Sequence, residues 1–133
     1  MLRWPSLAEA ILYQERVVCE TGGHIGVLDQ AKLEAALARP LIVVFEHETF
    51  PTPVLKVAAL IDSIITTHPF LDGNKRTAMR LGLAVMEFNC SALDDPTDQE
   101  IEDLAVGIAT GDISIVQCAQ WPAHYYDCRK DNG

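Results

Sequence analysis

Apolar residues recur at helical spacing along most of the chain, and glycines, prolines and polar turns mark where the pattern breaks. Residues 5–20 carry one apolar face, and Gly22 and Gly23 end that segment. Asp29 suits the N-cap of a second helix, which Pro40 stops. The first part of the chain is therefore predicted to form two helices joined by a glycine-rich loop.

The helical pattern is lost between residues 41 and 52. β-Branched residues and Phe45 precede a polar stretch bounded by prolines, which is typical of an extended flap or a short hairpin. Residues 53–67 are then apolar on nearly every side, so they are expected to form a central, buried helix. This helix would deliver the chain directly to His68.

Three more helices are expected in the second half of the chain. Thr97 and Glu100 form a capping box that starts one of them, which ends near Gly111. Before it, a helix is expected from Asn74 to about Asn89. The apolar face of that helix consists of Ala78, Leu81, Val85 and Phe88.

The last helix is expected over residues 113–126, bent or interrupted near Pro122, with a polar tail that frays. The prediction is an all-α fold, a compact bundle of about six helices with a short flap or β-hairpin before the central helix. A chain of 133 residues that is 49% hydrophobic can bury such a core. Residues 1–133 are therefore expected to form a single domain.

The charge balance narrows the range of partners. The formal net charge is −9, whereas proteins that follow nucleic-acid phosphates need a basic face. Direct nucleic-acid binding is therefore not expected, although a small basic pocket is compatible with this charge. The N-terminus lacks the apolar run of a signal peptide and no 18-residue apolar span occurs, so a cytoplasmic protein without membrane contact is expected.

The cysteines fit the same expectation. They lie far apart in the sequence, include no CxxC pair, and form no cluster with histidine at the spacing of a zinc site. In a cytoplasmic protein they are expected to be reduced thiols, mostly buried as small apolar side chains. The four are Cys19, Cys90, Cys118 and Cys128.

The candidate catalytic and binding residues are concentrated in the stretch THPFLDGNKR, residues 67–76. Pro69 and Gly73 disfavour an uninterrupted helix, so a short turn is expected, followed by the free N–H groups of a new helix. Such N–H groups after a glycine form an anion site. His68 can accept a proton from an attacking hydroxyl near neutral pH. Asp72 can hold Mg²⁺, which typically takes one or two carboxylates together with substrate phosphates.

Lys75 and Arg76 stand in the first turn of this helix, where a cation costs about 0.3–1 kcal/mol against the helix dipole. A bound polyphosphate reverses that argument, because the N–H groups and both cations then converge on one anion. The set predicts a site for phosphoryl or nucleotidyl transfer. The alternative is an ordinary Asp-Gly turn with an asparagine cap, Phe70 in the core and two solvated cations.

The motif HPFLDGNKR resembles the signature HxFx(D/E)GNxR of the Fic/Doc (Fido) family. The matching positions are His68, Phe70, Asp72, Gly73, Asn74 and Arg76. The loop, and the segment GGHIGVLDQAKLEAALARP before the predicted flap, are similar to the death-on-curing (Doc) branch of that family. The expected helices fit the family's fold as well, so the resemblance covers nearly the whole chain.

The resemblance implies a role for each matching polar position. His68 would activate the hydroxyl of a target Ser, Thr or Tyr. Asp72 would bind Mg²⁺ on the phosphates of ATP. Gly73 and Asn74 would build the anion hole, and Arg76 would hold phosphate.

The resemblance also implies how the loop is supported and how the protein is restrained. Phe70 would anchor the loop in the core, and residues 41–52 would form the flap that aligns a target segment by strand-like pairing. Many family members carry a self-inhibitory (S/T)xxxE(G/N) helix, and this sequence has none. A separate antitoxin chain that covers the nucleotide site is therefore expected.

Two positions depart from the pattern of members that transfer AMP. Such members usually have glycine at Lys75 and a second arginine three residues after Arg76, where this chain has Met79; Arg80 follows one residue later. Doc-type members have lysine at Lys75, bind the nucleotide in reverse and transfer its γ-phosphate. The resemblance thus implies a toxin that phosphorylates elongation factor Tu; the alternatives are AMP transfer to a protein hydroxyl and an inactive scaffold that binds an antitoxin.

Overall fold

The computed structural model describes residues 2–128, and its first two helices follow the apolar pattern. Helix α1 spans Leu7–Thr21, and the hydroxyl of Ser6 accepts a hydrogen bond at its start as the N-cap. Helix α2 spans Gln30–Ala38 and runs into a short 3₁₀ turn, Arg39–Leu41. The two predicted N-terminal helices are therefore confirmed.

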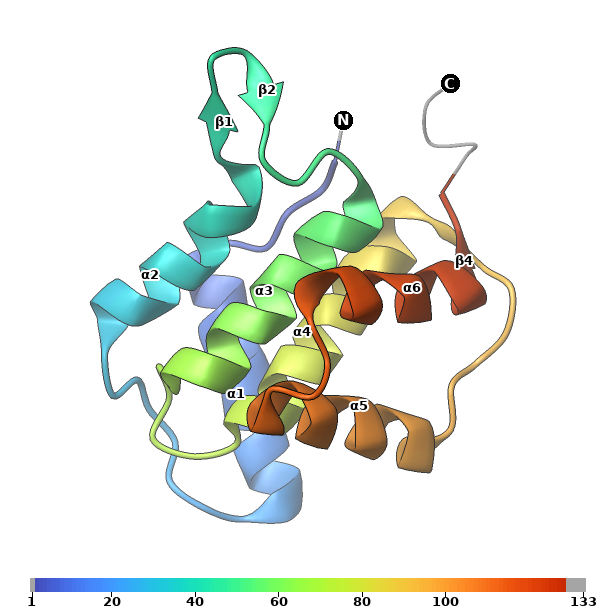
Figure 1. Ribbon diagram of the computed structural model, residues 1–133. Helices are drawn as coiled ribbons and strands as arrows, with labels where there is room; N and C mark the ends of the chain where they lie inside the picture. The colour runs from blue at the N-terminus through green and yellow to red at the C-terminus, as the bar shows by residue number, and fades with distance from the viewer. Residues whose placement is uncertain (1, 129–133) are drawn as a thin grey trace.

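A hairpin and the central helix follow. Strand β1, Val43–Val44, pairs antiparallel with strand β2, His47–Glu48, and every residue of this hairpin is exposed. It projects from the helical body at the top of Figure 1. Helix α3, Pro53–Thr67, begins at its N-cap Thr52. The predicted flap is thus a short hairpin that stands directly before the central helix.

The second half contains α4 (Asn74–Asn89), α5 (Asp98–Thr110) and α6 (Ile115–Tyr125). A small antiparallel pair that the sequence analysis did not predict, β3 (Ser91–Ala92) and β4 (Tyr126–Asp127), joins the end of α4 to the end of α6. The described residues therefore form six α-helices and two short strand pairs, which confirms the all-α prediction. None of these helices is long and apolar enough to cross a membrane.

Helix α3 forms the centre of the core and contacts α2, α4, α5 and α6. Figure 1 shows it between α2 and α6, with α4 running behind. Leu60, Ile61 and Ile64 of α3 are at most 1% exposed, as expected for a helix that is apolar on nearly every side. The helix carries its C-terminal end to the turn that holds the predicted chemistry.

Two details of the C-terminal half differ from the prediction. The last helix begins at Ile115 and not at residue 113, because Ser114 and Gln117 form a capping box there. Pro122 lies inside this helix without ending it. Phe88, predicted on the apolar face of α4, is 50% exposed, because the helix turns that position away from the core.

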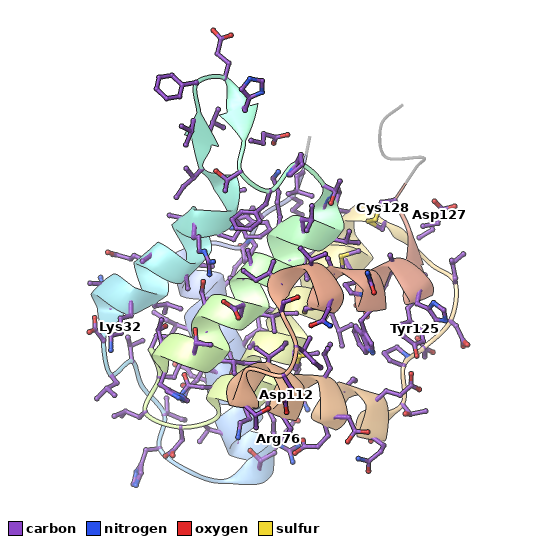
Figure 2. All side chains as sticks on the ribbon, in the orientation of Figure 1. Lys32, Arg76, Asp112, Tyr125, Asp127 and Cys128 are labelled. Carbon is purple, nitrogen blue, oxygen red and sulfur yellow. A yellow bond between two sulfur atoms is a disulfide. The ribbon has the colours of Figure 1, made fainter. Side chains whose placement is uncertain are left out.

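The expectation of four reduced and mostly buried cysteines is wrong. The β3–β4 pair brings Cys90 and Cys128 to a Cα–Cα distance of 4.4 Å, and they form a disulfide, seen near the label of Cys128 in Figure 2. Cys19 is a free thiol but exposed. Cys118 is buried, and that burial raises its pKa to about 12. Of the tail predicted to fray, residues 129–133 lie outside the described residues.

Candidate active site

The turn between α3 and α4 exposes His68 and buries Phe70. His68 is the C-cap of α3, with a left-handed backbone (φ 50°) and an exposed side chain. Non-glycine residues in this conformation are uncommon and concentrate at functional sites. Phe70 is 1% exposed and forms a backbone bridge with Val27. The turn is therefore anchored in the core through Phe70 while it presents His68 to solvent.

The amide of Asn74 closes this turn. Its Oδ1 accepts a hydrogen bond from the Phe70 N–H, and its Nδ2 donates to the Phe70 carbonyl, each at 3.0 Å. These contacts engage both ends of the Asn74 side chain, so what this residue can offer an anion is its backbone N–H. Gly73 is the N-cap of α4 with φ 73°, and no side chain caps this helix. The first N–H groups of α4 are thus not satisfied by a capping side chain.

The cations at this helix start differ in their partners. Lys75 and Arg76 are exposed, and neither makes an ion pair within residues 2–128. Arg80, one turn further on, is paired with Glu20 of α1. This hydrogen-bonded contact raises the pKa of Arg80 and lowers the pKa of Glu20. Lys75 and Arg76 therefore keep their charge available for an external anion.

The carboxylate of Asp72 is held from the loop that follows α1. Its Oδ2 accepts a hydrogen bond from the His24 N–H at 2.6 Å. Within residues 2–128 no hydrogen bond reaches its Oδ1, and no group of three or more His, Cys, Asp or Glu side chains is placed to hold a metal ion. A divalent cation at Asp72 would therefore need further ligands from phosphate or water, as Mg²⁺ usually has.

The sequence analysis missed a buried residue that supports this loop. Gln14 of α1 is 0% exposed, and its Nε2 donates to the carbonyl groups of His24 and Asp72, each at 3.1 Å. The signal was present in the sequence, because Gln14 lies at helical spacing from Ala10 and Val17 on the apolar face of α1. A polar residue on a buried face has to find buried partners.

The structure brings the predicted polar residues together in one open hollow. Phe70 is not among the residues that line this hollow and is buried in the core instead, as expected for an anchor of the loop. Figure 2 labels Arg76 at the lower edge of the molecule, at the end opposite the hairpin. The residues that line the hollow are Thr21, Gly22, His68, Leu71, Asp72, Gly73, Asn74, Lys75 and Arg76.

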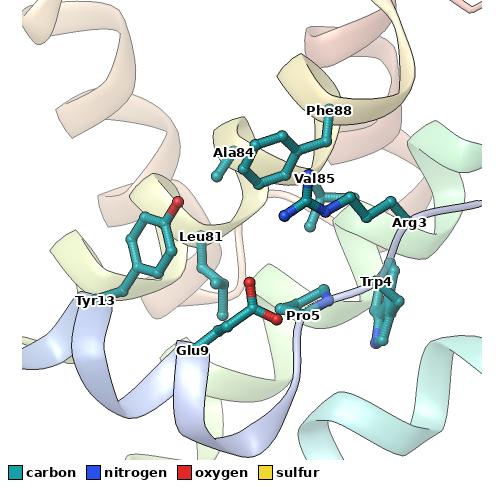
Figure 3. Close-up of a pocket in the computed structure, with 9 residues that line it drawn as sticks. All are labelled: Arg3, Trp4, Pro5, Glu9, Tyr13, Leu81, Ala84, Val85 and Phe88. Atoms are coloured by element: carbon teal, nitrogen blue, oxygen red, sulfur yellow. The ribbon is translucent and has the colours of Figure 1, made fainter.

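A second hollow lies between the N-terminal segment, α1 and α4 (Figure 3). The carboxylate of Glu9 accepts a hydrogen bond from the Ser6 N–H, which lowers the pKa of Glu9. The guanidinium of Arg3 lies 4.1 Å from the centre of the Phe88 ring. These charged groups are engaged in local contacts that stabilise the helix start and the N-terminal segment, so the candidate reactive set remains the one around His68.

Comparisons with known proteins identify a family whose model spans this turn. The model of the Fic/DOC family matches residues 4–86, which include the hairpin and the whole turn. The chain is 36% identical over 95 residues to Toxin Doc of Mycolicibacterium smegmatis, covering 71% of this chain and 73% of that protein. It is 32% identical over 120 residues to Protein kinase doc of Escherichia phage P1, covering 89% and 91%. The chain therefore belongs to the Fic/DOC family.

Proposed function

We propose that this protein is a Doc-like toxin that transfers the γ-phosphate of ATP to a Ser or Thr hydroxyl of a target protein, with elongation factor Tu as the target. The observation that carries the proposal is the hollow that His68 and Asp72 share with the uncapped start of α4 and two unpaired cations. The printed names of the two relatives, a toxin and a protein kinase, support the same function.

Each residue in the hollow has a distinct part in this reaction. His68, exposed at the end of α3, accepts the proton of the attacking hydroxyl. The N–H groups at the start of α4, together with Lys75 and Arg76, hold the phosphate oxygens and balance their charge. Asp72 would hold Mg²⁺ through Oδ1, and the bound ion would neutralise phosphate charge during the transfer.

The exposed hairpin suits the recognition of a protein substrate. An edge strand that nothing covers offers its N–H and C=O groups to an extended segment of another chain. Val43 and Val44 are 57% and 50% exposed, and Phe45 at the tip is 91% exposed. The hairpin precedes the start of α3 and His68 follows its end, about 22 Å away along a helix of 15 residues, so a target segment that pairs with the hairpin would have to extend along the molecule to place its hydroxyl at His68. A separate antitoxin chain that covers the nucleotide site would then restrain the toxin.

The choice of the γ-phosphate rests on two side chains of α4. Met79, where an AMP-transferring relative would have its second arginine, is 1% exposed and packs in the core. Arg80 is paired with Glu20 and so does not replace that arginine as a free cation. The start of α4 therefore supplies Lys75 and Arg76 without a further arginine clamp, which favours the Doc type of transfer.

The test supplies purified protein, purified elongation factor Tu and ATP that is labelled at either the α or the γ phosphorus. Label is expected on the target from γ-labelled ATP alone, and His68→Ala is expected to abolish it. His124→Ala is the matched control, because His124 is an exposed histidine of α6 outside the hollow. Transfer of label from the α-labelled nucleotide would show AMP transfer instead. Transfer of label by the His68→Ala variant would show that His68 is not the general base.

A further inference from the structure

The loop that follows α1 is fastened to the catalytic turn by one buried amide. Gln14 donates to the carbonyl groups of His24 and Asp72, and its Oε1 accepts a hydrogen bond from the Gly26 N–H at 3.1 Å. All three contacts reach backbone groups of two separate loops. Because Gln14 is 0% exposed, water cannot replace these hydrogen bonds if they are lost.

Gly23 permits the same loop to approach the carboxylate of Asp72 closely. A Cβ atom on Gly23 would lie 3.0 Å from the Cβ and 3.1 Å from the Oδ2 of Asp72. Its φ of +109° is also a conformation that side chains disfavour. The absence of a side chain at this position lets the next N–H group, that of His24, reach Oδ2 at 2.6 Å.

We propose that Gln14, Gly23 and the N–H of His24 are positioning groups that fix the Asp72 carboxylate before a Mg²⁺-nucleotide binds. The hydrogen bond from His24 holds Oδ2 and leaves Oδ1, which no other group within residues 2–128 engages, available on a residue that lines the hollow. The inference rests on the proposed function, because it concerns the cation that accompanies the nucleotide. Partners that orient a metal ligand typically change metal affinity by about 10–100-fold when they are removed.

A purely structural role of Gln14 is the competing explanation, and the chain contains a matched control for it. Asn89 is a second buried amide, 8% exposed, that also makes three hydrogen bonds to backbone groups. It fastens the N-terminal segment to α4 and does not line the hollow. Replacement of either amide is expected to lower the stability of the fold. Only replacement of Gln14 is expected to reduce the Mg²⁺ effect, which is the gain in nucleotide affinity that Mg²⁺ provides.

The experiment compares Gln14→Met with Asn89→Leu, both close in volume to the residues they replace. The affinity for the β,γ-imido analogue of ATP is measured by calorimetry in Mg²⁺ and in EDTA, and thermal unfolding is recorded in parallel. For Gln14→Met, the tightening of binding by Mg²⁺ is expected to fall about tenfold or more while the affinity in EDTA is unchanged. For Asn89→Leu, the melting temperature falls and both affinities stay as in the wild type.

A second pair of variants leaves the core intact. Gly23→Ala places a methyl group against Asp72 in an exposed loop and is expected to weaken the Mg²⁺ effect as well. Gly111→Ala is its control, since Gly111 has φ +82°, meets nothing within 4 Å and does not line the hollow. A full Mg²⁺ effect in Gln14→Met and Gly23→Ala would overturn this inference alone. If the wild-type protein binds the nucleotide with the same affinity in Mg²⁺ and in EDTA, the proposed function is overturned together with this inference.

Discussion

At the scale of single residues, Gly82 shows how closely α3 and α4, the two helices on either side of the candidate site, are packed. A Cβ atom there would lie 2.6 Å from the Cδ1 and 2.8 Å from the Cγ1 of Ile61, and 3.2 Å from a methyl group of Val57. The backbone of α4 therefore rests directly on side chains of α3. Since the turn that holds the candidate site joins these helices, their separation sets where His68 lies relative to the start of α4.

Two opposed effects decide the outcome of Gly82→Ala. Alanine in a helix interior is favoured over glycine by about 1 kcal/mol. The clash with Ile61 acts against it, and overpacking of this kind costs about 1–3 kcal/mol. We expect Gly82→Ala to lower the free energy of unfolding by about 1 kcal/mol, measured by urea titration. The added change Ile61→Val, which removes Cδ1, should recover most of the loss, and simple additivity of the two changes would contradict the clash.

At the scale of elements, the hairpin is held at its base by a buried lysine of α3. The Nζ of Lys56 lies 2.9 Å from the Oε1 of Glu48 and also donates to the carbonyl of Phe50. The guanidinium of Arg39 lies 5.6 Å from the centre of the Phe50 ring and donates to Ser63. The hairpin itself is exposed throughout, so these contacts at its base fix its orientation.

Lys56→Met should therefore loosen the hairpin while the core remains folded. Hydrogen bonds to a charged group contribute about 1.5–3 kcal/mol, and roughly 1.4 kcal/mol corresponds to a tenfold change in a local opening equilibrium. The Thr49 N–H, which donates to the Ile42 carbonyl at 3.0 Å, should exchange with solvent about tenfold faster. Lys32→Met, at an exposed lysine of α2, is the control. Unchanged exchange of Thr49 in Lys56→Met would mean that the lysine does not hold the hairpin.

The elements that the sequence predicted are those whose signals are local. The N-caps Ser6 and Thr97, the glycines after α1, and the apolar run of α3 each act within a few residues of one another. The β3–β4 pair and the contacts of Gln14 join segments far apart in the chain. Spacing along the sequence carries no information about such partners, so the motif supplies the candidate site residues but not the groups that hold Asp72.

At the scale of the whole molecule, the last two helices are enclosed in a covalent loop. The disulfide between Cys90 and Cys128 joins positions 38 residues apart, on either side of α5 and α6. The two helices are also tied to each other, because the hydroxyl of Tyr125 donates to the carboxylate of Glu100 at the start of α5. Both helices pack on α3, so the disulfide adds to a fold that noncovalent contacts already define.

Reduction of this disulfide should therefore lower stability without removing the helices. Closing a loop of this length restricts the unfolded chain by up to about 4 kcal/mol, and measured contributions are typically 2–4 kcal/mol. For a chain of this size that corresponds to a fall in melting temperature of roughly 10 °C. The measurement is a thermal melt by circular dichroism with and without reductant, with free thiols counted in parallel.

Two variants separate the disulfide from other effects of the reductant on this transition. The double variant Cys90→Ser with Cys128→Ser should melt at the lower temperature under both conditions. Cys19→Ser, which changes the exposed free thiol, should keep the full response to reductant. If the wild-type melting temperature stays constant while two further thiols become titratable, the loop contributes nothing to stability. In that case the packing of α5 and α6 on α3 alone holds the C-terminal half together.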